Sequence, residues 1–341
     1  MKKTILLLTT LCVFAFTVKA QDEDSGLKIS GSVDTYYKYD FSGEPNIETS
    51  FANEQNSVSI GMIDIALEQT VGKASFVGEI AFGPRNAGSA GPGASVMEPH
   101  IQNLYVSYAF SDLLTLSAGY MGTFVGYEVI SPTGNFNYST SRLFTNGPFQ
   151  NAGIKADFTI SDRFAFMVGL FDDWNVYQDF NGVSDFGAQI YVAPVEGWDV
   201  YLNFITGYHT QAFYTDLAGS VTEFDITTGY QITDAFYLGL NFATASAEFE
   251  DDSEDGFTGL ALYPQYAISD AVAIGLRYEN FSWKDAQSYN SFTLSVPISS
   301  GPLTFIPEFR LDTSDEDVFE DSDLAATGSA SQVSLAAIYA F

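Results

Sequence analysis

One stretch of the chain, Gly119 to Gln150, combines unusual residue types and spacing: GYMGTFVGYEVISPTGNFNYSTSRLFTNGPFQ. Only two of its side chains are charged, Glu128 and Arg142, and fixed charges of this kind attract or repel charged solutes. Structureless connections of this length are uncommon in compact domains and are usually functional or disordered. Phe and Tyr side chains are spread along the stretch, whereas disordered segments are poor in aromatics. We therefore expect an ordered loop folded into a cavity.

Residues that could carry catalysis form no recognisable pattern. A hydrolase with a nucleophile needs a base such as His, and the two histidines, His100 and His209, have no motif around them. A glycosidase needs a pair of carboxylates, but 43 Asp and Glu residues offer too many pairs for any one to be informative. We expect neither an enzyme nor a bound cofactor.

The N-terminus has the features of a secretory signal. Lys2-Lys3 precedes an apolar run over residues 5–16 and the small-residue site Val18-Lys19-Ala20. A transmembrane anchor is the weaker alternative, because the run is short for a span of ~20 residues. We expect residues 1–20 to be removed and residues 21–341 to form a single domain. The only cysteine leaves with the signal, which excludes disulfides and Cys-ligated metal from the mature chain.

The composition is acidic but rich in apolar residues. A formal net charge of −30 argues against nucleic acid as a partner. Hydrophobic residues make up 46% of the chain and aromatic residues 16%, which is far too much for disorder. No segment after the signal has the ~18 consecutive apolar residues of a membrane helix. These properties together indicate a secreted, all-β chain.

Apolar residues repeatedly alternate with polar or small ones, as in a strand with two different faces. The residues expected to face outward are Leu238, Leu240, Ile274, Leu276, Leu335 and Tyr339, and those expected to face inward are Asn241, Arg277, Glu279 and Ser334. The alternation changes phase between Ile60 and Ile63, which predicts a β-bulge near Gly61.

Short and long connections divide the mature chain into sixteen expected strands. Four short turns pair a hydroxyl residue with Asp, a combination that initiates tight turns: Ser111-Asp112, Ser161-Asp162, Thr233-Asp234 and Ser269-Asp270. Three further short turns are expected at 71–73, 194–197 and 299–302. The eight connections between them are mostly longer: 42–55, 84–99, 121–150, 172–183, 210–219, 250–256, 284–288 and 313–329.

Short turns on one side, long loops on the other and an even number of strands are typical of a bacterial outer-membrane barrel. We therefore predict a transmembrane, antiparallel, up-and-down β-barrel of about sixteen strands. A soluble β-sandwich is the weaker alternative, because it has no reason to sort its loops in this way.

The last residues support a barrel. Val333, Leu335, Ala337, Tyr339 and Phe341 alternate with small residues and Ile338, and the chain ends on Phe341 itself. A terminal aromatic on the outward face resembles the signal by which outer-membrane barrels are recognised for assembly. We expect Tyr339 and Phe341 to form this signal for the barrel assembly machinery; an ordinary final strand is the alternative.

The segments GTFVGYEVISPTGNFNYSTSRLF, GPFQNAGIKADF, ISGSVDTYYKYDF and GLFDDWNVYQDFN resemble the OmpL-like family of β-barrel porins of Gram-negative bacteria. The resemblance covers most of the mature chain and is most specific between Gly119 and Asn181. It implies a water-filled barrel in the outer membrane and leaves the solute open. Asn151 stands where we expect a His in the family, which puts only a loop contact in doubt.

In sixteen-stranded porins the third extracellular loop folds inward and narrows the pore, and residues 121–150 are the third long connection here. The resemblance therefore implies a constriction in which charge and pore radius decide which solutes pass. Its candidate residues are Tyr127, Glu128, Asn137, Tyr138 and Arg142. In the alternative, Glu128 and Arg142 pair with each other or with the wall and hold the loop in place.

Carboxylates gather in other predicted loops. Asp172, Asp173 and Asp179 surround Trp174 at the expected pore rim, but their spacing matches no Ca²⁺-binding loop, so solvated rim charges are favoured. The acidic runs over 248–255 and 312–323 are also expected in solvated outer loops. Divalent cations that bridge them to lipopolysaccharide phosphates are the alternative.

These patterns together predict a porin that lets small hydrophilic solutes or ions diffuse passively across the bacterial outer membrane, with a preference for cations. Its partners would be the lipid bilayer and lipopolysaccharide. A homotrimer is one assembly that the chain could form. An adhesin that binds a partner through its long loops is the alternative function.

Overall fold

The computed structural model describes residues 26–341 apart from 88–99, 177, 180 and 211–216. The expected signal peptide, residues 1–20, and its cysteine lie outside the described residues. Within the described part, no helix is long and apolar enough to cross a membrane.

Strands make up most of the described chain. In order they are β1 (Lys28–Asp40), β2 (Ser57–Val71), β3 (Ala74–Phe82), β4 (Ile101–Ala109), β5 (Leu114–Gly122), β6 (Gln150–Ser161), β7 (Phe164–Phe171), β8 (Asp185–Val192), β9 (Trp198–His209), β10 (Gly219–Gln231), β11 (Phe236–Phe249), β12 (Glu254–Ala267), β13 (Ala273–Trp283), β14 (Ser288–Ser295), β15 (Ile298–Ser300), β16 (Leu303–Ser314), β17 (Phe319–Glu320), β18 (Ala326–Thr327) and β19 (Ser329–Ala340). The loops contain short helical turns, which among the described residues are α1 (Pro84–Ala87), η2 (Pro132–Gly134) and α2 (Arg142–Asn146).

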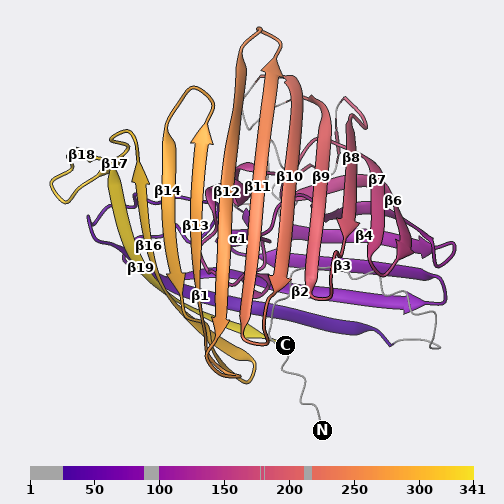
Figure 1. Cartoon of the computed structure of the whole chain (residues 1–341), viewed down its shortest axis with the longest axis horizontal. Coiled ribbons are helices and arrows are strands. Elements are labelled where there is room, and N and C mark those ends of the chain that lie inside the picture. Colours follow the sequence, from indigo (N-terminus) through magenta and orange to yellow (C-terminus); the bar gives the residue numbers. More distant parts are fainter. Residues whose placement is uncertain (1–25, 88–99, 177, 180, 211–216) are drawn as a thin grey trace.

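The strands form one closed antiparallel sheet (Figure 1). β1 pairs with β2 on one side and with β19 on the other, which leaves no free edge. β14 and β15 both pair with β16 and are two parts of one wall strand, interrupted at Val296 and Pro297. The barrel therefore has sixteen strands, as the sequence predicts, and β17 and β18 form a separate hairpin in the last loop.

Side chains along the strands alternate between lumen and membrane. Leu335 and Tyr339 are 50% and 47% exposed on the outer face, while Arg277 and Glu279 are fully buried inside. The predicted assignment of faces is confirmed at these positions and at Asn241, which is buried. A closed barrel satisfies all backbone hydrogen bonds between strands, so its outer face can be apolar and meet lipid.

The predicted bulge lies between β1 and β2. The register shifts between Val33 and Thr35, so that Gly61 and Met62 together oppose Asp34. Asp34 Oδ1 accepts a hydrogen bond from the Met62 backbone N at 2.7 Å. A Cβ on residue 61 would overlap the Asp34 carboxylate, so glycine makes room for this inward-facing acid.

The connections sort as the sequence predicts. In the short turns at Ser111, Thr233 and Ser269, the hydroxyl oxygen accepts hydrogen bonds from backbone N–H groups two and three residues later. The long connections lie at the opposite ends of the strands from these turns. We name them L1 to L8 in chain order. L1 covers residues 41–56, L2 covers 83–100, L3 covers 123–149, L4 covers 172–184 and L8 covers 315–328.

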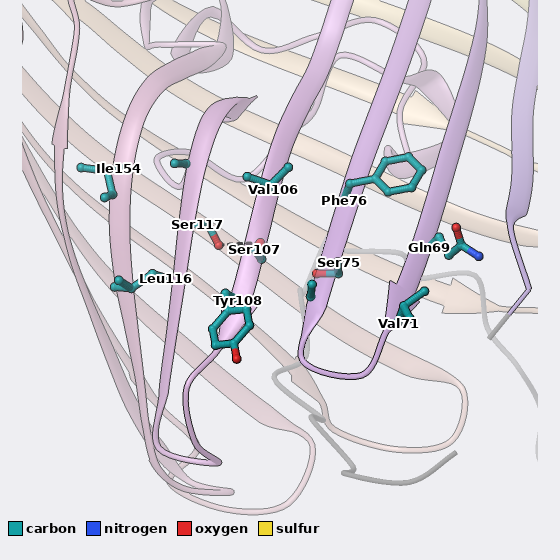
Figure 2. A pocket seen from close by; sticks show the side chains of 12 residues that line it. Gln69, Val71, Ser75, Phe76, Val106, Ser107, Tyr108, Leu116, Ser117 and Ile154 are labelled. Atoms are coloured by element: carbon teal, nitrogen blue, oxygen red, sulfur yellow. Dashed lines mark hydrogen bonds between the residues drawn. The ribbon is translucent and has the colours of Figure 1, made fainter. Parts of the chain in front are cut away.

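The outer wall has a shallow depression of about 490 Å³ across β2 to β6 (Figure 2). Phe76, Val106 and Tyr108 project around it, while small residues such as Ala118 leave space between them. Val106 is 62% exposed and Tyr108 is 46% exposed, so the depression opens away from the lumen. This part of the wall offers a recess to lipid chains or to another protein.

Candidate functional site

L3 contributes residues to four buried apolar clusters, two of which show how it packs against the inner wall of the barrel. Leu143, in α2, packs with Phe257, Tyr263 and Phe281 of β12 and β13. Tyr138 belongs to a second cluster, with Tyr36, Ile306, Ala336 and Ile338 of β1, β16 and β19. Since these wall residues face the lumen, L3 lies inside the barrel.

A buried ion pair joins L3 to β13. Arg277 Nη1 lies 2.7 Å from Glu128 Oε1, and the two residues are 0% and 6% exposed. The same guanidinium donates to the backbone oxygens of Ser139 at 2.5 Å and Thr140 at 3.2 Å. The second Glu128 oxygen accepts from Ser141 N at 2.7 Å. Glu128 therefore pairs with the wall, which is one of the alternatives that the sequence left open. A buried carboxylate requires such a partner.

Arg142 makes the second charged contact. Its Nη2 lies 3.0 Å from Asp312 Oδ2, and its guanidinium lies 3.8 Å from the centre of the Tyr289 ring. The side chain is 14% exposed, whereas Asp312 is fully buried and also paired with Arg310. The assignment of Asp312 to a solvated outer loop is therefore wrong, because the residue lies in β16 and faces inward.

Wall carboxylates also bind the backbone of L3. Glu279 accepts from the N–H groups of Arg142 and Leu143 at 3.0 and 2.8 Å. Glu308 accepts from the N–H groups of Tyr138 and Ser139 at 2.8 and 3.2 Å. Hydrogen bonds to an ionised acceptor are stronger than neutral ones. These carboxylates therefore act as anchors for the loop.

The remaining constriction candidates contact the wall as well. Tyr127 stacks on Tyr263 with ring centres 4.2 Å apart. Asn137 Nδ2 donates to Ser295 Oγ at 2.7 Å, and Tyr138 Oη donates to Asp34 Oδ2 at 2.5 Å. Burial raises the pKa of the Tyr127 and Tyr138 hydroxyls, so both stay neutral donors. These three side chains hold the loop from within.

The extracellular loops L1 and L2 also pack around L3. Arg85, in α1 of L2, donates to the backbone oxygens of Ile130 at 3.2 Å and Tyr138 at 3.1 Å. Its guanidinium lies 4.7 Å from the Phe51 ring of L1 and 4.8 Å from the Tyr138 ring. Sequence reasoning did not single out Arg85, Glu308 or Arg310. Their charges, and for the strand residues their positions in the alternating pattern, could be seen in the sequence. Nothing in the sequence indicated that these side chains contact L3.

L3 also meets β2 and β3, where Ile130 and Phe144 share a buried cluster with Met62 and Ala81, but some other inward-facing residues of β2 to β6 are less covered. Glu79, Asn103, Tyr105 and Lys155 are only partly buried there. Asn103 Nδ2 donates to Glu79 Oε2 at 2.6 Å, and Lys155 Nζ lies 3.3 Å from Asp157 Oδ1. Polar, partly exposed side chains thus line the wall opposite the anchored face of L3.

The three rim candidates lie together in L4. Asp173 is 7% exposed, so the interpretation as a solvated charge is wrong for this residue. Its backbone N donates to Asp179 Oδ2 at 2.9 Å. Burial, and then the charges of Asp179, Asp173 and Asp185, raise the pKa of Asp172 to about 6. Carboxylates of L4 and Asp185 at the start of β8 thus gather at this edge of the barrel.

Solved structures with the same architecture include porins and other outer-membrane proteins. An anion-selective porin from Comamonas acidovorans matches with a TM-score of 0.64 and 12% identity over 94% of this chain and 100% of its own. The outer-membrane channel DcaP of Acinetobacter baumannii matches with a TM-score of 0.64 and 12% identity over 92% and 97%. The trimer form of OmpT from Vibrio cholerae matches with a TM-score of 0.57 and 14% identity over 94% and 100%. At these identities the likeness shows the fold alone.

The closed sixteen-stranded barrel with polar side chains inside defines the class of outer-membrane porins. No curated protein matches the chain by sequence. Residues 26–341 match the family described as "Putative beta-barrel porin-2, OmpL-like", and the chain belongs to that family. Its place is therefore the bacterial outer membrane, and the resemblance seen in the sequence is confirmed.

Replacing Arg277 by Met should lower the free energy of unfolding by about 3–5 kcal/mol, because Glu128 is left as a buried charge without a partner. The double variant Glu128→Gln/Arg277→Met should recover much of this loss. Urea unfolding of the refolded chain in detergent measures both changes. Lys284→Met is the control, since it breaks an exposed pair with Glu254 and should change little. An equal effect of Arg277→Met and Lys284→Met would contradict the anchor.

Proposed function

We propose that this porin lets small hydrophilic solutes pass by passive diffusion and that L3 forms its constriction. The observation that carries the proposal is the attachment of L3 to the inner wall by Arg277, Glu279, Glu308 and Asp312. A loop held inside the lumen by charged groups on two wall strands, β13 and β16, narrows the path through the barrel. Solutes would pass between L3 and the inner face of β2 to β6.

We further propose a preference for cations. Among described side chains on the inner face of β2 to β6, Lys155 is the one basic residue, while Glu68 and Glu79 are at least partly exposed. A negative lining raises the local concentration of cations. Salt should weaken this preference, because the Debye length is only about 10 Å at 0.1 M. Asp172, Asp173 and Asp179 would extend the negative potential to the rim.

Shortening L3 by replacing residues 131–136 with two glycines should increase single-channel conductance. This segment precedes the wall contacts of Asn137 and Tyr138, so the anchors are kept. Planar-bilayer recordings measure the change. The matched control is a two-glycine replacement of residues 321–324 in L8, away from L3. If conductance is the same in both variants, L3 does not limit the pore.

The same recordings under a salt gradient test the cation preference. Lys155→Gln should shift the reversal potential towards stronger cation selectivity, and Lys73→Gln, which makes the same charge change in the turn between β2 and β3, should shift it less. An anion preference of the unsubstituted chain would refute the proposal. A bilayer that stays silent would favour the alternative, a surface-binding protein that acts through its loops.

We propose that Tyr339 and Phe341 form the recognition signal for the barrel assembly machinery. Phe341 is 57% exposed on the outer face, and its backbone pairs with Gly31 at 3.0 and 3.1 Å. Phe341→Ala keeps these backbone bonds and should slow insertion in the presence of the machinery, whereas Ala340→Gly should not. Insertion kinetics into proteoliposomes measure the difference. Equal rates would leave Phe341 with a role in closing the barrel only.

We propose a homotrimer in contact with lipid and lipopolysaccharide, with the recessed wall of β2 to β6 at the subunit interface. Support comes from the depression around Val106 and from the trimer described for OmpT of Vibrio cholerae. Val106→Arg should convert the assembly to monomers, because a charge would be buried between subunits. Light scattering in detergent measures the mass, with Leu240→Arg as the control on the far wall. A monomeric unsubstituted chain would refute the trimer.

A further inference from the structure

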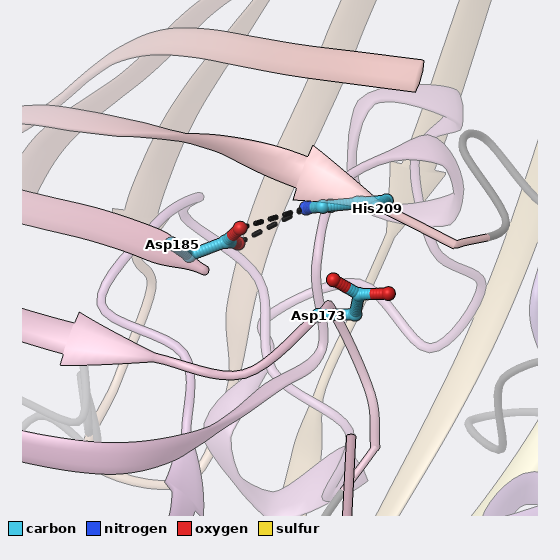
Figure 3. A group of neighbouring side chains, drawn as sticks. All are labelled: Asp173, Asp185 and His209. Carbon is cyan, nitrogen blue, oxygen red and sulfur yellow. Dashed lines mark hydrogen bonds and ion pairs between the residues drawn. The ribbon is translucent and has the colours of Figure 1, made fainter. Parts of the chain in front are cut away.

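Three ionisable side chains meet at the extracellular edge of the barrel (Figure 3). Asp173 comes from L4, Asp185 begins β8 and His209 ends β9. They are 7%, 1% and 2% exposed, and one donor atom of each lies within 4.8 Å of the other two. His209 Nε2 is 3.0 and 3.1 Å from the two Asp185 oxygens. This is a mixed imidazole and carboxylate site in a buried position.

The surrounding backbone is shaped to hold these groups. Gly207 lies beside Asp185, and a Cβ at position 207 would overlap the Asp185 carboxylate. The missing side chain lets this carboxylate lie across β9 and reach His209. Glycine at this position therefore forms part of the site.

Neighbouring donors orient the second carboxylate. Asp173 Oδ1 accepts from Ser184 Oγ at 3.1 Å, and Oδ2 accepts from the backbone N and Oγ1 of Thr210 at 2.9 and 3.0 Å. The Trp174 ring meets the His209 ring edge-on, with centres 5.4 Å apart. Partners of this kind set the direction of metal ligands in proteins.

The charge of the cluster is not balanced by the protein. Asp172 and Asp179 of L4 add two carboxylates to those of Asp173 and Asp185. Among the ion pairs of the described residues, His209 is the one positive partner of this group. Burying two carboxylates beside one imidazole is costly unless a cation joins them.

We propose that Asp173, Asp185 and His209 bind a divalent first-row transition-metal cation such as Zn²⁺. The ion would replace the proton that His209 and Asp185 share. His209 and Asp185 are 3.0 Å apart, and tetrahedral ligands about 2.0–2.2 Å from one ion lie roughly 3.3–3.6 Å apart, so a small widening of this contact would admit the ion. A small rotation of Asp173 would complete the set and leave one position open.

The donor set selects the kind of cation. Imidazole nitrogen is a good ligand for Zn²⁺ and for copper, iron and nickel ions, whereas Ca²⁺ and Mg²⁺ prefer sites made of oxygen ligands. The bound ion would tie L4 to the ends of β8 and β9, whether or not the pore conducts. Without the ion, the hydrogen bond between His209 and Asp185 is a structural contact.

Isothermal titration of the untagged, refolded chain with Zn²⁺ at pH 7 tests the proposal. One ion per chain should bind, and millimolar Ca²⁺ should not displace it. His209→Gln should weaken binding at least about 10-fold, the lower end of what the loss of a supporting partner costs. His100→Gln is the matched control, because the chain has only two histidines, and it should bind as the unsubstituted chain does.

Absence of Zn²⁺ binding by the folded, unsubstituted chain would overturn the proposal. So would equal affinities of His209→Gln and His100→Gln. If His209→Gln does not fold, as judged by heat-modifiable gel migration, anomalous diffraction at the zinc edge from crystals of the unsubstituted chain decides the question. Anomalous density between the three side chains supports the site, and density only elsewhere refutes it.

Discussion

The buried pair of Arg277 and Glu128 is the contact on which the interior of this barrel depends. A guanidinium on the inner wall has lost its water and needs acceptors, and L3 supplies a carboxylate and the backbone oxygens of Ser139 and Thr140. The loop in turn has polar backbone groups that cannot remain unpaired inside the lumen. The guanidinium thus gains acceptors, and the loop gains a donor for its polar groups. This mutual pairing explains why the loop adopts one conformation.

The same logic extends around the wall. Glu279 and Glu308 are acceptors without protons to give, and the N–H groups of the loop are donors without helical or sheet partners. Hydrogen bonds between these two sets of groups fix the backbone of L3 to the acidic wall. Arg85 adds a positive group from L2 between the rings of Phe51 and Tyr138, so that three extracellular loops become one packed body. A loop with few charges of its own is thus held at many points by the groups around it.

The acidity of the chain thus has two structural roles. Some carboxylates, such as Asp312 and Glu308, are buried anchors whose charge is used within the protein. Others, at L4 and along the inner face of β2 to β6, have fewer positive neighbours within the protein. Net charge does not distinguish the two groups, because the distinction depends on which carboxylate meets a donor in three dimensions.

The sequence by itself determined the barrel. Period-two alternation is a local property of a strand, so the faces of Leu335 and Arg277, the bulge at Gly61 and the turns at Ser111 and Ser269 could all be predicted from neighbouring residues. Glu128 and Arg142 could be identified as the charges of L3, but their partners could not. Arg277 is 149 residues from Glu128, and Asp312 is 170 residues from Arg142. Only closure of the barrel brings such residues together, since the energy of an ion pair depends on distance and burial in space. For the same reason, only the tertiary structure placed His209 beside Asp185.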